Sequence, residues 1–226
     1  LAAKPRVQWS VENPIESTSE NFSKTLYLAK ACAESNTRFV FSSTAAVYGN
    51  VDNLPTAEYE NFLIKTMTEI LRVSGLVFFN IQMITGNKPA LFRFMGHFAD
   101  QIKELIVWDK GSGQPAIGEG VLNSAYELII VLGDKPITRS FHSSSFSRGS
   151  LDNIWRIKKT RSVNANHKAS FPVDLVETIT RNFGFKNASI FDPFLGTGTT
   201  AIAAHYGGFD FVGCELDEDY YKAASN

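Results

Sequence analysis

The stretch ASIFDPFLGTGTTAIAA, residues 188–204, decides the fold class of this 226-residue chain. Its apolar beginning predicts a short strand at 188–191, and its apolar end predicts a helix at 199–206. Between them, the absence of side chains at Gly196 and Gly198 lets the backbone approach a ligand closely. A strand, a glycine turn and a helix in this order are typical of one unit of a nucleotide-binding α/β sheet.

A second strand and an acidic residue complete this unit. Residues 209–214 (FDFVGC) are predicted as a strand, and Glu215 follows at its tip, 19 residues after Gly196. An acid at that place is suited to accept hydrogen bonds from two ribose hydroxyls. Glycines that serve only helix and strand packing are the simpler alternative. The complete set of strand, glycines, helix, strand and acid favours a ligand site.

The rest of the chain after residue 56 also alternates between helices and strands. Helical spacing of apolar residues predicts helices, and short apolar runs predict buried strands. The predicted elements are a helix at 57–73, a strand at 76–82, a helix at 87–101, strands at 103–108 and 125–132 around a glycine-rich loop at 111–120, and a helix at 171–183. We therefore expect an α/β fold with helices on both faces of the sheet and an antiparallel hairpin at one edge.

The segment from Thr138 to Lys168 is strongly basic. It contains one acid, Asp152, and the aromatic residues Phe141, Phe146 and Trp155 are interspersed in it. Its seven cations are Arg139, Arg148, Arg156, Lys158, Lys159, Arg161 and Lys168. A solvated basic loop is one interpretation. The other is a basic and aromatic surface that contacts a polyanion, for which such a charge asymmetry is required.

Composition limits the class of protein. With 44% hydrophobic residues the chain can bury an ordinary globular core. No apolar run approaches the roughly 20 residues that cross a bilayer, and the start resembles no export signal, so we expect a cytoplasmic protein without a membrane contact. Cys32 and Cys214 lie far apart in apolar surroundings, so we expect neither a disulfide framework nor a metal site.

Three motifs carry a family resemblance. DPFLGTGTT (192–200), FVGCELDEDYY (211–221) and NHKASFPVDLVETI (166–179) resemble the S-adenosylmethionine-binding motifs of the DNA amino-methyltransferases. These enzymes modify adenine N6 or cytosine N4, and the order of the motifs resembles the permuted "beta" arrangement of the family. The resemblance covers about residues 51–226.

This resemblance implies a Rossmann-like sheet and an S-adenosylmethionine-dependent methyltransferase that acts on an exocyclic amine in double-stranded DNA. It also implies a cofactor site made of Phe171, Pro172, Asp192, Phe194, Gly196, Thr197, Gly198, Thr199 and Glu215. The basic stretch, about 139–168, falls where the family keeps its DNA target-recognition segment. Because this segment is short, we expect either a compact recognition element or dependence on a second subunit, such as a homodimer partner.

The motif that positions the target amine is missing. The family flips the target base out of the duplex and holds its amine with (Asp or Asn)-Pro-Pro-(Tyr, Phe or Trp). No such tetrapeptide occurs in this chain. Residues 45–48 (AAVY) stand at about the right place, but they offer only Tyr48 as a candidate catalytic residue, and an ordinary packed tyrosine is the simpler interpretation. We expect methyl transfer to be strongly impaired, whereas the cofactor site can be intact.

Residues 1–50 resemble a different family, the NAD-dependent nucleotide-sugar epimerases and dehydratases. FVFSSTAAVYG at 39–49 is similar to the strand that carries a catalytic hydroxyl in that family, here Thr44. The other parts for hydride chemistry are absent, because no glycine-rich cofactor turn precedes this strand. The expected Tyr-x-x-x-Lys pair is missing as well, since Tyr59 is followed four residues later by Leu63.

We therefore divide the chain into an epimerase-like segment, 1–50, and a methyltransferase core, 51–226. FVFSS (39–43) favours β structure and can take the sheet position of the strand that the core lacks. Two alternatives stay open: a fragment of an NAD-dependent epimerase, and a catalytically silent module that keeps the cofactor cleft and the basic segment. The junction itself fits a natural fusion, a truncated reading frame or an assembly artefact.

Overall fold

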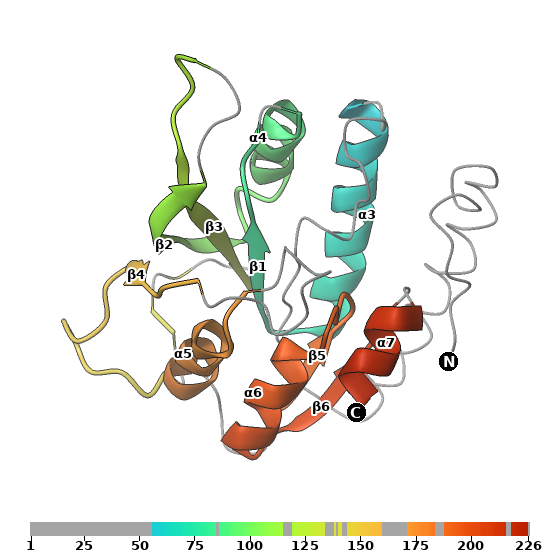
Figure 1. Cartoon of the computed structure of the whole chain (residues 1–226), viewed down its shortest axis with the longest axis vertical. Coiled ribbons are helices and arrows are strands. Elements are labelled where there is room, and N and C mark those ends of the chain that lie inside the picture. Colours follow the sequence, from blue (N-terminus) through green and yellow to red (C-terminus); the bar gives the residue numbers. More distant parts are fainter. Residues whose placement is uncertain are drawn as a thin grey trace.

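The computed structural model describes residues 56–84, 86–114, 119–133, 138, 140–141, 144–159, 171–183, 188–215 and 218–225, and the structural statements below concern these residues. Figure 1 shows the elements that they form. In chain order these are α3 (Thr56–Val73), β1 (Leu76–Ile81), α4 (Lys88–His97), β2 (Ile102–Gln114), β3 (Ser124–Gly133), β4 (Ile154–Arg156), α5 (Val173–Phe183), β5 (Ser189–Asp192), α6 (Thr199–Gly207), β6 (Asp210–Gly213) and α7 (Glu218–Ser225).

Every helix and strand predicted between residues 57 and 214 is present, and three details differ. The loop predicted at 111–120 begins later, because β2 continues through Gln114. The short strand β4 and the C-terminal helix α7 were not predicted. The α/β class is therefore confirmed, and the differences concern short or exposed elements.

The larger sheet has the strand order β1–β3–β2–β4. β3 runs antiparallel to both of its neighbours, with Ile106 of β2 opposite Ile129 of β3, so β2 and β3 form the predicted hairpin. The three residues of β4 pair in parallel with β2, where Trp155 lies beside Trp108. One short strand thus extends the sheet beyond the hairpin.

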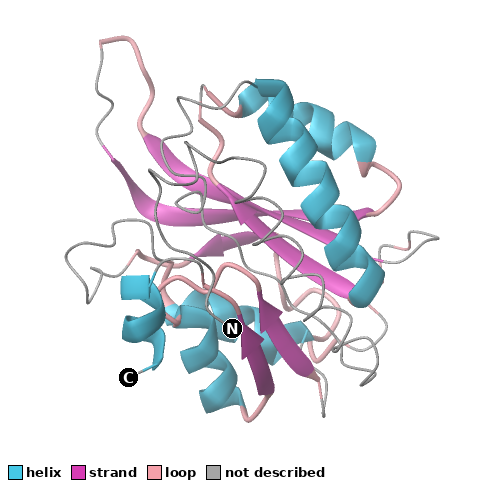
Figure 2. Ribbon diagram, turned by 90° about the vertical axis from the view of Figure 1, so that its right-hand side faces the viewer, coloured by secondary structure: helices cyan, strands magenta, loops and turns pink. Residues whose placement is uncertain are grey.

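β5 and β6 form a separate parallel pair, with Asp192 opposite Gly213 at its carboxyl end. Figure 2 shows this pair beneath the larger sheet, with α6 and α7 beside it. In Figures 1 and 2, β1, β5 and β6 all run upward, so their carboxyl ends point to the same side of the molecule. In sheets of this kind, ligands bind at that side.

Two hydrophobic clusters cover the two faces of the larger sheet. Val77 and Phe79 of β1 pack with α3 and α4 on one face, and Phe78 packs with α5 on the other, as the period of two in a strand requires. Phe191 of β5 belongs to the first cluster, and Ala203 of α6 belongs to the second. β5 is therefore joined to the larger sheet through the first cluster, and α6 is joined to it through the second.

Helix α3 shows how the apolar spacing forms one of these faces. Tyr59, Leu63, Met67 and Ile70 recur at intervals of four, four and three residues and are all at most 3% exposed. Burial raises the pKa of the Tyr59 hydroxyl to about 12, although a hydrogen bond with Asn87 acts in the opposite direction. Tyr59 is therefore a core residue and is unsuited to act as a base in hydride chemistry.

Candidate cofactor and nucleic-acid sites

Asp192, the last residue of β5, is hydrogen-bonded to residues at both ends of the glycine turn. Its side chain is completely buried. Oδ1 accepts a hydrogen bond from the backbone N–H of Phe194 at 3.0 Å, and Oδ2 accepts one from the hydroxyl of Thr200 at 2.6 Å. One carboxyl group thus ties the start of the turn to the first turn of α6. Asp192 therefore stabilises the shape of the turn.

The surroundings of Asp192 change its ionisation. Burial raises the pKa of this carboxyl from 3.8 to about 7, and the negative charge of Glu215 contributes in the same direction. The hydrogen bonds from Thr200 and Phe194 lower the pKa, because they stabilise the ionised form. The carboxyl group that is hydrogen-bonded to the turn therefore changes its charge near neutral pH.

Glu215 lies at the carboxyl end of β6, half-buried beside the turn. Its Oε2 accepts a hydrogen bond from the backbone N–H of Gly196 at 2.6 Å. Two backbone bonds of 2.9 Å join the same region: Leu195 donates to the carbonyl of Cys214, and Cys214 donates to the carbonyl of Asp192. The acid that follows the glycine by 19 residues therefore contacts the glycine turn.

The two glycines of the turn share a backbone conformation, and Gly198 in addition lies close to another helix. Gly196 and Gly198 both adopt positive φ, 58° and 90°, which side chains disfavour. A Cβ on Gly198 would also lie 3.1 Å from the Cβ and 3.2 Å from the Cα of Ala224 in α7. Close packing against α7 is thus a sufficient reason for glycine at position 198. For this residue, the simpler interpretation that glycine serves packing holds.

The sequence pointed to Thr199 but not to Thr200. Thr199 is half-buried at the start of α6, whereas Thr200 is fully buried and bonds to Asp192. Adjacent helix residues face directions about 100° apart, so only one threonine of such a pair can turn back toward the strand. The sequence signal was the pair of adjacent threonines, but the residue type does not show which of the two hydroxyls faces Asp192.

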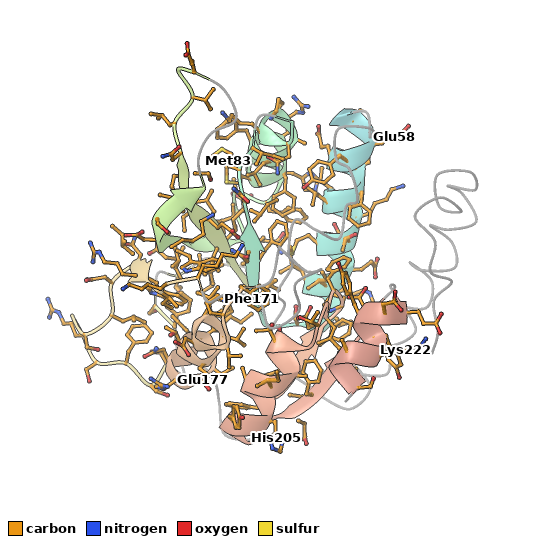
Figure 3. The ribbon with its side chains drawn as sticks, in the orientation of Figure 1. Glu58, Met83, Phe171, Glu177, His205 and Lys222 are labelled. Carbon is orange, nitrogen blue, oxygen red and sulfur yellow. The ribbon has the colours of Figure 1, made fainter. Side chains whose placement is uncertain are left out.

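Phe171 and Pro172 immediately precede α5, and both are buried. Phe171 packs in the second cluster with Trp108 of β2 and Ala203 of α6. Figure 3 shows Phe171 near the middle of the molecule, above α5 and α6. Packing of Phe171 therefore connects the start of α5 to the helix that follows the glycine turn.

The residues at the turn fit a ligand with a ribose. A carboxylate, Glu215, lies next to a backbone N–H at the carboxyl ends of two parallel strands. Phe194 and Thr197 are half-buried on the outer side of the turn, whereas Asp192 is buried beneath it. A nucleoside requires acceptors for its ribose hydroxyls and a backbone that it can approach closely, and both are present here.

The described part of the basic segment lies along β4 and the turn before it. Arg148, Arg156, Lys158 and Lys159 are all exposed. The Nε of Arg156 lies 3.9 Å from a carboxylate oxygen of Asp109, and the Arg156 side chain is 74% exposed. Three of these cations follow one another at the carboxyl end of β4, where they face solvent.

The aromatic residues of this segment point inward. Phe141, Phe146 and Trp155 surround Phe183 of α5, with ring centroids 4.9, 5.2 and 6.3 Å from it. The Trp155 indole donates to the carbonyl of Asp152 at 2.8 Å. These rings therefore anchor the segment to the core. The predicted basic and aromatic surface is corrected in this respect, because these three rings pack against Phe183 whereas the described cations are exposed.

Several predicted residues lie outside the described part of the chain. They are Thr44, Tyr48, Arg139, Arg161 and Lys168. Tyr48, the candidate catalytic residue, therefore stays a prediction from sequence. Cys214 is half-buried against the first cluster and takes part in no disulfide among the described residues.

The described residues contain neither a group of metal ligands nor a membrane-spanning helix. There, no three His, Cys, Asp or Glu side chains are grouped so that they could hold a metal ion. No helix in the same part of the chain combines the length and the apolar character needed to cross a bilayer.

Two family models match the chain. A model described as "DNA methylase" matches residues 45–226, and one described as "NAD dependent epimerase/dehydratase family" matches residues 1–68. The first match includes every described site residue. The two overlap at 45–68, the region in which the junction near residue 50 was expected.

Curated relatives and solved structures agree with the first model. The type II methyltransferase M.MthZI of Methanothermobacter thermautotrophicus is 29% identical over 198 residues, covering 70% of this chain and 56% of that protein. The putative methylase YubD of Escherichia coli K12 is 37% identical over 60 residues, 26% of each chain. The chain thus spans less than two thirds of the length of either relative.

The similarity extends to three dimensions. The PvuII DNA methyltransferase (cytosine-N4-specific) superimposes with a TM-score of 0.71 at 17% identity, covering 89% of this chain and 82% of that one. At this identity the match concerns the fold, and it confirms the Rossmann-like methyltransferase sheet.

Proposed function

The chain belongs to the DNA methylase family, whose model matches residues 45–226, and on this premise we propose that it is the core of a site-specific, S-adenosylmethionine-dependent DNA methyltransferase. The target is an exocyclic amine of adenine or cytosine in double-stranded DNA. The observation that carries the proposal is the hydrogen-bonded turn, with Asp192 and Thr200 buried beneath it and Glu215 at its outer side. Because its substrate is DNA, we place the protein in the cytoplasm.

S-adenosylmethionine supplies an activated methyl group when it is bound. Glu215 is placed to accept hydrogen bonds from the ribose hydroxyls, in exchange for its bond to the N–H of Gly196. Phe194, Thr197 and Thr199 line the half-exposed side of the turn toward the adenosyl and methionine parts. Asp192 keeps this arrangement in place, and Phe171 with Pro172 packs the neighbouring helix.

Methyl transfer also needs groups that orient the target amine. A flipped base must present its amine in line with the methyl group, and acceptors for the amine protons must hold it there. The sequence lacks the tetrapeptide that provides these acceptors in the family, and Tyr48 offers only a ring. We therefore expect cofactor binding with strongly impaired transfer, which keeps a catalytically silent binding module as the second candidate.

The cations at β4 are proposed to contact DNA phosphates. Arg148, Arg156, Lys158 and Lys159 are exposed and belong to a segment with a single acid. Cations near phosphates contribute affinity that falls with salt concentration. Arg139 and Arg161 extend the same segment in sequence, and we include them in the proposed contact.

The division into segments 1–50 and 51–226 is retained as a proposal, with two family models that meet near it as its support. A homodimer is proposed from the shortness of the target-recognition segment alone. Light scattering of the protein on its cognate DNA tests it, and a clean monomer would exclude the dimer.

A titration with S-adenosylmethionine tests the cofactor site. Glu215→Ala removes the acceptor for the ribose, and hydrogen bonds to a charged group contribute about 1.5–3 kcal/mol, so we expect about 10- to 100-fold weaker binding. Asp192→Ala should also weaken binding, because the turn loses two bonds. Asp174→Ala, an exposed acid in the first turn of α5, is the control. Unchanged affinity for S-adenosylmethionine in both site variants would refute the proposal.

Restoring the missing motif tests the catalytic part. The triple substitution Ala45→Asp, Ala46→Pro, Val47→Pro creates Asp-Pro-Pro-Tyr at 45–48. We expect radiolabelled methyl transfer into mixed-sequence DNA to rise above that of the unchanged chain, with cofactor affinity unaltered. If the unchanged chain binds the cofactor and neither protein transfers methyl groups, the silent module is the better description.

A further inference from the structure

We propose that the tip of the β2–β3 hairpin, with Val121 and Leu122, enters a groove of the DNA and packs against the bases. This contact lies outside the basic segment and the cofactor turn. It rests on the proposed function, because DNA methylation supplies the ligand. The hairpin thereby becomes a second DNA-contacting element, one that acts through apolar contact.

The tip exposes apolar side chains. Val121 is 63% exposed and Leu122 is 92% exposed, the largest fraction among the large hydrophobic side chains of the described residues. Single exposed leucines are common on protein surfaces, so exposure alone singles out neither residue. Two adjacent exposed apolar side chains at the tip of a hairpin, however, form a small apolar surface that a partner can cover.

The hairpin projects toward the side where ligands bind. β2 and β3 pair regularly as far as Asp109 and Tyr126, and after an irregularity Gln114 pairs with Ser124, beyond the other strands of the sheet. In both Figure 1 and Figure 2 the hairpin rises in the direction of the carboxyl ends of β1, β5 and β6 and reaches the top of the drawing. The major groove of B-DNA, about 12 Å wide, admits a two-stranded β-ribbon.

Cations lie at the base of the same hairpin. A Cβ on Gly111 of β2 would lie 3.7 Å from Cγ of Lys158, and Arg156 reaches toward Asp109 of β2. Gln114 is three residues further along β2, a span of at most about 10 Å of extended chain. Cations at the base can thus meet phosphates at the rim of a groove about 8.5 Å deep while the tip reaches its floor.

The chemistry of the tip favours base contact over phosphate contact. Among the described tip residues 119–123 (EGVLN), the only charged one is the acid Glu119, which phosphates repel. Apolar side chains inserted between base steps partially unstack them and kink the duplex. An enzyme that acts on a base outside the stack needs the duplex opened, and an apolar tip on the same molecule provides a means.

Photo-cross-linking tests the position of the tip. We introduce p-benzoylphenylalanine at Leu122 (Leu122→Bpa) and irradiate the complete chain with mixed-sequence duplex DNA. The control is Tyr206→Bpa, which is 73% exposed and follows His205 at the far end of α6. We expect a cross-link to DNA from position 122 and none from position 206. A cross-link from position 122 only to a second copy of the chain overturns the proposal.

Affinity at several salt concentrations separates apolar from ionic contact. Leu122→Ser should weaken duplex binding about tenfold, equal to about 1.4 kcal/mol, without changing the slope of log Kd against log salt. Lys158→Ala should reduce that slope by about 1, and Tyr206→Ser should change neither quantity. If the unchanged chain binds no DNA, the proposed function fails together with this inference. DNA binding that is unaffected by Leu122→Ser refutes the inference alone.

Discussion

Replacing Asp192 by asparagine should change how the free energy of unfolding depends on pH. The folded-state pKa of this buried carboxyl is about 7, and its ordinary value is 3.8. Between these values the folded protein holds a proton that the unfolded chain has lost, so stability falls as the pH rises and levels off above 7. At about 1.4 kcal/mol per tenfold change in the equilibrium constant, the whole fall is about 4 kcal/mol.

The Asp192→Asn variant keeps the geometry and removes the ionisation. Its amide oxygen can accept from the N–H of Phe194, and its amide nitrogen can donate to the hydroxyl oxygen of Thr200. We expect the two proteins to be about equally stable in acid. Above pH 7 the variant should be the more stable one by up to about 4 kcal/mol, because it buries no charge.

Urea unfolding followed by tryptophan fluorescence, from about pH 3 to about pH 8, measures this difference. Other groups that titrate contribute equally to both proteins, so the difference between the two curves isolates Asp192. Asp174→Asn, at an exposed position, is the matched control and should follow the unchanged chain. Parallel curves for Asp192→Asn and the unchanged chain would refute the burial argument.

Two further substitutions test the packing of the turn and of the hairpin. Gly198→Ala should lower the free energy of unfolding by about 2 kcal/mol or more, because a positive φ is combined with close contact to Ala224. Gly149→Ala, with positive φ and open space, should cost only about 1 kcal/mol, and equal losses in urea unfolding would contradict the contact with α7. Lys110→Met should lower the free energy of unfolding by about 3–5 kcal/mol, because it leaves the nearly buried Glu127 without its ion pair of 3.3 Å. The double substitution Lys110→Met with Glu127→Leu should be nearly neutral, because neither charge is then left unpaired. Additive losses in this double-mutant cycle would contradict a coupling between the two residues.

The sequence predicted those elements whose residues alone decide their structure. β1 reads as a continuous apolar run because both of its faces are buried. β4 could not be predicted in this way, since Ile154 and Arg156 are exposed and only Trp155 is buried. Its three residues form a strand because β2 lies beside them, which is a property of the fold. Likewise, α7 has no buried residue, so its apolar spacing carries little signal.

The same distinction applies to the site. The spacing between Gly196 and Glu215 reflects the length of one helix and one strand, so it could be read along the chain and the structure brings the two residues into contact. Which side chain of a segment faces inward depends on its neighbours. For that reason the bond from Thr200 to Asp192 and the inward rings around Phe183 emerged only in three dimensions.

Cofactor binding and methyl transfer are physically separable in this chain. The three side-chain hydrogen bonds described at the turn join residues between Asp192 and Glu215, all in one unit of two strands and a helix. The tetrapeptide is missing at residues 45–48, outside this unit, so its loss removes acceptors for the amine without removing a partner of these bonds. Misplacement of a reacting group by about 1 Å can cost about 100-fold in rate, and loss of both acceptors should cost more. We therefore expect a protein that binds its cofactor and transfers methyl groups poorly.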